Sequence, residues 1–336
     1  VNNKLINYIL KMNFCPKISV IIPTYNRSKY LIKIITKIAN SRIRNEIIVC
    51  DSNSKDQTKE KIKKIQSDHK NQIIRYINIK KNISAIKRNV GAKLAQSKYI
   101  VFLDDDCIPE DKFLENFYQV LERFKNKEFL FCGTVYYPYS KINNNLINYR
   151  QSRHFKVDKK NQIGNFFLQP KNIVTMVMAV KKKTLFDNNL FFNEKFNKYG
   201  FEDYEFGFRA YKKKIRILPC SPVVFHHDLR GLKEYLNKIK FSAYEGSKYL
   251  VRINKAASLE NNYVNLENKL IIKLLAKSMF ISKLMIFMEN LFICLEKNIR
   301  FPNIVYRIFS VNSYLIGHFL SKSIKKKDKN FQEWYR

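Results

Sequence analysis

The chain has 336 residues, of which 63 are Lys or Arg and 28 are Asp or Glu, giving a formal net charge of +35 at pH 7. Hydrophobic residues make up 46% of the sequence and aromatic residues 14%, which is enough for a packed core and excludes wholesale disorder. The net charge is +23 over residues 1–228 and +12 over residues 229–336, so neither part forms a basic tail. Most of the charge is therefore interpreted as a lysine-rich background.

The first hundred residues alternate between short apolar runs and amphipathic segments. Residues 18–23 (ISVIIP) form a continuous apolar run, as expected for a strand buried on both faces. Ser28 is a candidate cap for the helix that follows this strand. The alternation predicts a parallel, doubly wound sheet, in which ligands bind outside the carboxyl ends of the strands. Further strands are predicted at residues 46–51, 73–79 and 99–103, with helices at 55–67 and 84–96.

The remainder of the chain is divided by a change of pattern near residue 230. Beyond that point the apolar spacing is helical throughout. This predicts an N-terminal extension (1–16), an α/β domain (17–230) and a helical C-terminal region (231–336). Within these, helices are expected at 111–124, 202–213, 231–253, 264–297 and 303–324, strands at 129–136, 172–180, 215–218 and 223–225, and a polar loop at 137–164.

One cluster of acidic residues follows the fourth predicted strand. Asp104, Asp105 and Asp106 repel one another and gain nothing from packing, so they need a cation or hydrogen-bond donors nearby. Carboxylate oxygens suit hard divalent ions such as Mg²⁺ and Mn²⁺. A solvated turn or a helix cap is the alternative interpretation. The position at a strand end favours a metal site.

A second acidic cluster and a histidine pair follow later in the chain. Glu202, Asp203 and Glu205 lie in the first turn of a predicted helix, where the helix dipole stabilises negative charge. Capping is one interpretation of these acids, and a general base held beside a substrate is the other. His226 and His227 follow an apolar run, which makes them candidate metal ligands, with His226 preferred.

Four segments resemble the successive signatures of family 2 glycosyltransferases: residues 18–27 (ISVIIPTYNR), 47–58 (IIVCDSNSKDQT), 82–91 (NISAIKRNVG) and 99–109 (YIVFLDDDCIP). Residues 196–209 (FNKYGFEDYEFGFR) and 224–228 (VFHHD) look like the carboxyl-terminal half of chondroitin-polymerase and β-1,4-galactosyltransferase catalytic domains. The resemblance covers residues 17–230. It implies the GT-A fold, a Rossmann-like nucleotide-sugar-binding sheet, and sugar transfer with inversion at the anomeric carbon.

The resemblance also implies roles for individual residues. Asp203 would be the general base that deprotonates the acceptor hydroxyl, and Glu202 would hydrogen-bond the acceptor. The third motif departs from the family pattern, because Ser84 stands where Gly is usual. Because Asp105 lies between Asp104 and Asp106, it stays open which two of the three carboxylates bind the metal and the nucleotide-sugar. Asp106 and His226 would bind the metal, Mn²⁺ or Mg²⁺. Asp51 would accept a hydrogen bond from the imide of a uracil base. The full set of residues expected to bind the nucleotide-sugar is Pro23, Tyr25, Arg27, Asp51, Arg88, Asp104 and Asp105.

The C-terminal helices carry a basic amphipathic pattern. Residues 270–295 place Lys273, Lys277 and Lys283 among Leu, Ile, Phe and Met, which is typical of a helix at an anionic membrane surface. Packing of these helices on one another, or a dimer contact, explains the same pattern; packing is favoured for the structure, and peripheral membrane contact is expected in addition. Residues 1–12 lack the features of a signal peptide, and the six cysteines show no C-x-x-C pair, which predicts free thiols in a reducing compartment. We therefore expect a cytoplasmic protein without a spanning helix, peripheral on the inner face of the cell membrane.

Two functions follow from these patterns. The leading one is an inverting, metal-dependent glycosyltransferase that moves a sugar from a UDP-sugar to a surface polysaccharide, a lipooligosaccharide or a lipid-linked glycan. The alternative is a basic nucleic-acid-binding protein without catalytic activity, which would need a focused cationic stripe with exposed aromatic residues. The even charge and the acidic strand ends favour the enzyme, so no nucleic-acid partner is expected. The oligomeric state is left open.

Overall fold

The computed structural model describes residues 15–70, 72–138, 144–197, 199–228, 230–266 and 278–323. These residues form two compact units. The first unit comprises the described parts of Val1–Pro138, His154–Glu194 and Phe206–His227, and the second those of Tyr139–Arg153, Lys195–Glu205 and Asp228–Arg336. The boundary expected near residue 230 lies close to Asp228, where the longest segment of the second unit begins.

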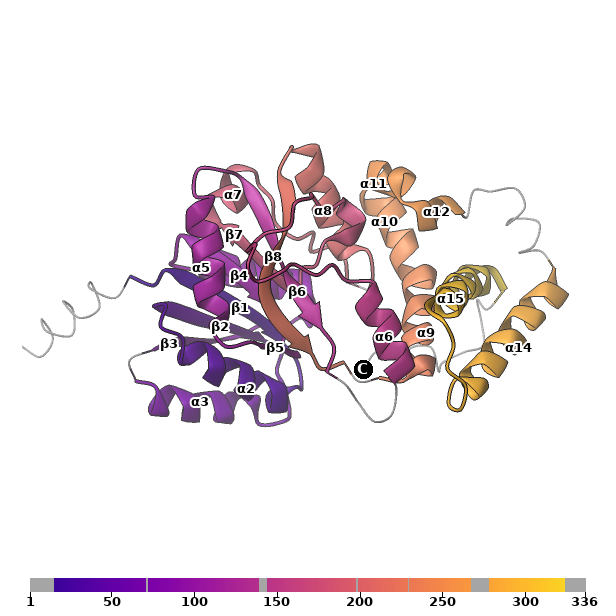
Figure 1. The fold of residues 1–336 in the computed structure, drawn as a ribbon, viewed down its shortest axis with the longest axis horizontal. Helices are drawn as coiled ribbons and strands as arrows, with labels where there is room; N and C mark the ends of the chain where they lie inside the picture. Colours follow the sequence, from indigo (N-terminus) through magenta and orange to yellow (C-terminus); the bar gives the residue numbers. More distant parts are fainter. Residues whose placement is uncertain are drawn as a thin grey trace, which may run out of the picture. The chain divides into compact units, whose positions relative to one another are not determined.

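An eight-stranded sheet forms the centre of the first unit, in the order β3-β2-β1-β4-β7-β6-β8-β5 (Figure 1). β1 (Ile18–Thr24) pairs in parallel with β2 (Asn45–Asp51) and with β4 (Tyr99–Leu103), and β2 pairs in parallel with β3 (Ile73–Asn78). Every residue of β1, β2 and β4 is buried, so both faces of these strands are covered. The four predicted strands are therefore confirmed.

The parallel arrangement predicted from the first hundred residues holds for β1 to β4, and the rest of the sheet is mixed. β7 (Val177–Lys181) runs antiparallel to β4 and to β6 (Phe129–Tyr136). β6 is parallel to β8 (Arg216–His226), and β5 (Cys107–Pro109) is antiparallel to β8. β8 is one strand where two short ones were expected, because an irregularity in its pairing with β6 accommodates the prolines at its centre.

The helices of the first unit are α2 (Ser28–Ala39), α3 (Thr58–Asp68), α4 (Ser84–Leu94), α5 (Phe113–Arg123) and α7 (Lys182–Asp187). The first four begin within three residues of their predicted positions, whereas α7 was not predicted. The proposed cap at Ser28 is wrong, because its side chain makes no capping bond; instead its backbone N–H donates to Asp56 Oδ2 at 2.7 Å. The strand expected at 172–180 starts at Val177, since Pro170–Asn172 form a 3₁₀ turn.

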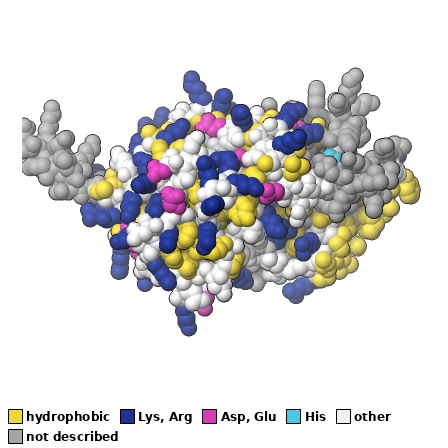
Figure 2. Space-filling view, turned by 90° about the horizontal axis from the view of Figure 1, so that it is seen from above, with side chains coloured by type: hydrophobic (Ala, Val, Ile, Leu, Met, Phe, Trp, Pro, Cys, Tyr) yellow, Lys and Arg dark blue, Asp and Glu magenta, His cyan; other side chains and the backbone are white. Residues whose placement is uncertain are grey.

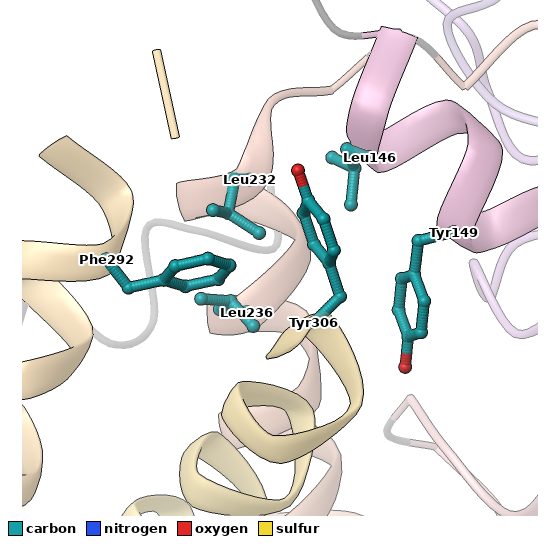
Figure 3. Packing of buried hydrophobic residues seen from close by; sticks show 6 residues of the cluster. All are labelled: Leu146, Tyr149, Leu232, Leu236, Phe292 and Tyr306. Atoms are coloured by element: carbon teal, nitrogen blue, oxygen red, sulfur yellow. The ribbon is translucent and has the colours of Figure 1, made fainter. Parts of the chain in front are cut away.

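The described part of the second unit is helical. Its elements are α6 (Asn144–Ser152), α9 (Leu232–Phe241), a π-helical turn (Ser242–Gly246), α10 (Ser247–Ile253), α11 (Lys255–Glu260), α12 (Asn262–Leu266), α14 (Met279–Leu295) and α15 (Asn303–Ser323). The expected loop at 137–164 is wrong over α6, whose Leu146 and Tyr149 enter the core of this unit (Figure 3). The other core residues are Leu232, Leu236, Phe292 and Tyr306.

α8 (Glu202–Lys212) begins in the second unit and ends in the first. In the second unit, α15 and α9 approach so closely at Gly317 that a Cβ there would lie 2.2 Å from the carbonyl oxygen of Lys240. None of the helices within the described ranges is long and apolar enough to cross a membrane. Four of the predicted free thiols are buried (Cys50, Cys107, Cys132 and Cys220), whereas Cys15 and Cys294 are exposed.

Candidate functional site

Three parallel strands of the first unit end in polar residues at one edge of the sheet. Thr24 ends β1 and is the pairing partner of Asp51, which ends β2. β4 ends at Leu103 and is followed directly by Asp104. Because β1 lies between β2 and β4, the ends of all three strands are neighbours, as the sequence predicted.

Asp105 lies at the centre of this edge and is 7% exposed. Its Oδ2 accepts hydrogen bonds from Thr24 Oγ1 at 2.8 Å and from the backbone N–H of Tyr25 at 3.4 Å, and its Oδ1 lies 3.1 Å from Arg27. Burial raises the pKa of Asp105 to about 6; Asp106 and Asp104 add to the rise, and Arg27 opposes it. A carboxyl group this costly to ionise favours a further cation nearby.

Asp106 is brought beside His226 by the pairing of β5 with β8, in which Cys107 faces His226. His226 Nε2 lies 3.4 Å from Asp106 Oδ1, and Cys107 Sγ lies 3.7 Å from the same oxygen. One ligand atom from each of these three residues lies within 4.8 Å of the others. Nδ1 of His226 is buried without a hydrogen bond to any described residue. A carboxylate and an imidazole in this arrangement fit a divalent metal.

Arg27 contacts this donor set directly. Its guanidinium forms ion pairs with Asp105 and with Asp106, and its side chain is 42% exposed. The two carboxylates raise the pKa of Arg27 above its ordinary value, although burial of the guanidinium opposes them. A metal at Asp106 would therefore compete with Arg27 for one carboxylate oxygen, and the exposed side chain has room to withdraw.

α4 supplies three consecutive buried polar residues, Lys87, Arg88 and Asn89. Arg88 donates to Asp104 Oδ1 at 2.7 Å, which places one predicted site residue against another. Lys87 Nζ donates to the carbonyl oxygen of Thr24 at 2.8 Å, and burial lowers the pKa of Lys87 to about 8. Sequence reasoning missed Lys87, although it lies within a quoted motif, because lysines are usually exposed.

Asp51 is fully buried, and its carboxylate already accepts three hydrogen bonds. The donors are the hydroxyl of Tyr76 at 2.7 Å, the backbone N–H of Ser54 at 3.1 Å and the Ser54 hydroxyl. A uracil imide would use the remaining acceptor capacity or displace one of these donors. Pro23 is buried within β1 and Tyr25 is half-buried, so Tyr25 is the more accessible of the two predicted nucleotide contacts.

The acids proposed to act on the acceptor lie in the second unit, at the start of α8. Gly200 (φ +107°) and Phe201 (φ +67°) both adopt left-handed backbone conformations that turn the chain into the helix. A Cβ at Gly200 would meet the hydroxyl of Ser242 at 2.2 Å, so the turn requires glycine. Glu202 Oε2 accepts from the backbone N–H of Gly200 at 3.1 Å, and Asp203 is half-buried.

A pocket of about 300 Å³ lies in the same unit. Tyr199 and Phe201, the residues on either side of Gly200, line part of its wall. Burial, together with the charges of Glu202 and Asp203, raises the pKa of Tyr199 in its wall. Aromatic side chains of this kind pack against the apolar faces of sugar rings, and their hydroxyls form hydrogen bonds. The pocket is lined by Arg153, Tyr199, Phe201, Tyr235, Lys238, Ile239, Ser242, Tyr263, Ser310 and Tyr314.

The chain matches known proteins over the part that holds the first acidic cluster. Residues 19–184 match the model described as glycosyl transferase family 2. The chain is 41% identical over 95 residues to the GalNAc(5)-diNAcBac-PP-undecaprenol beta-1,3-glucosyltransferase of Campylobacter jejuni, covering 27% of this chain and 30% of that protein. It is 29% identical over 231 residues to an uncharacterised glycosyltransferase of Methanocaldococcus jannaschii, covering 67% and 75%.

Two further relatives each match about a third of this chain. The chain is 32% identical over 109 residues to the poly(ribitol-phosphate) beta-N-acetylglucosaminyltransferase of Staphylococcus aureus, covering 30% of this chain and 32% of that protein. It covers 17% of an uncharacterised glycosyltransferase of Rickettsia bellii, so it spans a third or less of these two relatives. The fold is similar to that of a Pyrobaculum calidifontis mannosyltransferase solved with GDP-Man and Mn²⁺ (TM-score 0.56, 16% identity, covering 96% and 95% of the two chains).

Proposed function

We propose that this chain, whose residues 19–184 form a family 2 glycosyltransferase domain with the GT-A fold, is an inverting, metal-dependent glycosyltransferase. The observation that carries the proposal is the convergence of Asp51, Asp104, Asp105 and Asp106 at one sheet edge of that domain, with His226 beside Asp106. The similarity to chondroitin-polymerase and β-1,4-galactosyltransferase domains stays a prediction.

The donor is proposed to be a nucleotide-sugar, and specifically a UDP-sugar. Asp106 and His226 would hold Mn²⁺ or Mg²⁺, which when bound stabilises the negative charge of the diphosphate leaving group. Arg88 donates a hydrogen bond to Asp104, and its guanidinium carbon lies 5.2 Å from the centroid of the Phe192 ring. These two contacts hold the guanidinium in one orientation, in which it would bind the anionic donor. Asp51 would accept from the uracil imide, beside Pro23 and Tyr25.

The acceptor is proposed to be a hydroxyl of a glycan. Asp203 would take the proton of that hydroxyl as general base, and Glu202 would hydrogen-bond the acceptor. The rigid turn at Gly200 supports this assignment, because it fixes the first residues of α8 relative to the tyrosine-lined pocket of the same unit. A sugar residue of the acceptor would occupy that pocket.

The enzyme is proposed to extend a surface polysaccharide, a lipooligosaccharide or a lipid-linked glycan. Three relatives carry names that include transfer to such molecules: an undecaprenol-linked saccharide, poly(ribitol-phosphate) and, in Methanococcus voltae, a dolichyl phosphate sugar. Acceptors of this kind support a cytoplasmic, peripheral place on the inner face of an anionic membrane.

The nucleic-acid alternative is not favoured by any feature of the site. Figure 2 shows Lys and Arg side chains distributed over the visible face and interspersed with acidic ones. The strand ends, where a ligand would bind, carry carboxylates that would repel a phosphate backbone.

The test is a donor-hydrolysis assay with a panel of nucleotide-sugars and Mn²⁺, together with Mn²⁺ binding measured by calorimetry. Asp106→Ala should abolish both turnover and Mn²⁺ binding. Asp203→Asn should keep donor and metal affinity but lower transfer to an acceptor by about 10²–10⁴-fold. The proposal fails if no donor is bound or turned over and Asp106→Ala leaves the metal affinity unchanged.

A further inference from the structure

α14 in the second unit exposes a continuous apolar stripe. Phe280 and Phe287 are 76% and 62% exposed, far more than aromatic residues on the surface of a water-soluble helix usually are. Phe280, Leu284, Phe287, Leu291 and Leu295 recur at intervals of three and four, which places them on one side of the helix, with Met288 beside them. Figure 2 shows hydrophobic side chains gathered where α14 lies. The apolar face consists of Phe280, Leu284, Phe287, Met288, Leu291 and Leu295; Ile304 and Ile308, on the neighbouring α15, are each 57% exposed.

The opposite side of α14 holds its acids. Glu289 is 1% exposed, forms an ion pair with Lys240 and accepts a hydrogen bond from the Ser313 hydroxyl. Glu296 accepts from the hydroxyl of Tyr306 at 2.9 Å. This arrangement reverses that of a helix adapted to water, because the acidic groups point inward and the large apolar side chains point outward.

The charges around the apolar face have one sign. Between residues 278 and 310 the only acids are Glu289 and Glu296, and both are buried. Every exposed charged side chain in that stretch is basic: Lys283, Lys297, Arg300 and Arg307. Two copies joined through this face would bring these cations together, whereas an anionic surface would be attracted to them.

We propose that the apolar face docks onto an anionic lipid bilayer, with Phe280 and Phe287 inserted at the level of the acyl chains and the four cations beside the phosphate headgroups. Of the three lysines in the predicted basic amphipathic pattern, Lys283 is exposed on α14, whereas Lys273 and Lys277 lie outside the described residues. The inference rests on the proposed function in one respect, namely that a lipid-linked acceptor would be presented at the same bilayer.

The experiment is flotation of the full chain with vesicles of phosphatidylcholine containing 30% phosphatidylglycerol, and with vesicles of phosphatidylcholine alone, across a salt series. Phe280→Ser/Phe287→Ser should lower binding to the anionic vesicles by about tenfold or more. Phe166→Ser/Phe186→Ser is the matched control, since these residues are 46% and 40% exposed in the first unit, and it should bind within twofold of the wild type. Ile304→Ser/Ile308→Ser tests whether the exposed residues of α15 also take part in binding.

Wild-type binding should weaken with salt and be far lower on vesicles without phosphatidylglycerol. The inference is overturned if Phe280→Ser/Phe287→Ser, folded by circular dichroism, binds as the wild type does. It is also overturned if the wild type is a dimer by sedimentation equilibrium and this variant is a monomer, because the face then covers a second copy. Donor hydrolysis in lipid-free buffer separates this proposal from the proposed function. Phe280→Ser/Phe287→Ser should hydrolyse the donor as fast as the wild type does. If neither protein hydrolyses any donor, the proposed enzyme activity is refuted, whereas the vesicle result still stands.

Discussion

Lys87 should make the stability of the protein depend on pH in the alkaline range. The amine is 3% exposed and donates to the Thr24 carbonyl and to Asn82 Oδ1, and burial lowers its pKa from 10.5 to about 8. The folded state therefore releases the proton at lower pH than the unfolded state does. This contribution to stability is present above pH 10.5 and is lost as the pH falls through 8, and the difference corresponds to about 3 kcal/mol.

Urea unfolding of the wild type and of Lys87→Met at pH 7, 8.5 and 10.5 isolates this effect, because the other titrating groups are common to both proteins. The free energy of unfolding of the wild type should rise by about 3 kcal/mol relative to the variant across that range. Lys93→Met removes an exposed lysine from the same helix and controls for the loss of one charge. A constant difference between the wild type and Lys87→Met at all three pH values would refute the reasoning.

Three further variants test other contacts. Arg27→Ala should bind Mn²⁺ about five- to tenfold more tightly without nucleotide, measured by electron paramagnetic resonance, because a cation beside Asp106 is removed; weaker binding would count against the competition. Gly317→Ala should lower the free energy of unfolding by about 1–3 kcal/mol in urea, since its Cβ would overlap the Lys240 carbonyl; an unchanged midpoint would show that α15 yields. Asp228→Asn should cost about 3–5 kcal/mol in the same assay, because it leaves the Arg150 guanidinium buried beside a neutral group, and a cost below 1 kcal/mol would contradict this.

The first half of the fold could be predicted because each parallel strand is buried on both faces and therefore forms a continuous apolar run. The ends of those strands located Asp51 and Asp104 at one edge without any knowledge of side-chain contacts. α6 could not be found in this way, since Leu146 and Tyr149 enter a core whose other members come from residue 232 onward. Local periodicity does not report such distant partners.

The closeness of Asp106 and His226 also depended on long-range pairing. β5 has three residues, too few for a recognisable pattern, yet its pairing with β8 sets His226 opposite Cys107. The sequence identified His226 by its type and by its place after an apolar run, and the structure supplies the reason for its position. The burial of Lys87 had no sequence signal at all, because it follows from where α4 meets the end of β1.

The buried acids of this chain differ in how their charge is balanced, and this difference separates scaffold from site. Asp228 contacts Arg150 and Arg230, and Glu289 contacts Lys240, so each of these two carboxylates is paired with a cation. Asp105 and Asp106 are adjacent in the chain and both contact the guanidinium of Arg27, and burial raises the pKa of Asp105 to about 6. A divalent ion that binds these carboxylates would reduce the repulsion between them, and this supports the proposal that a metal binds at Asp106.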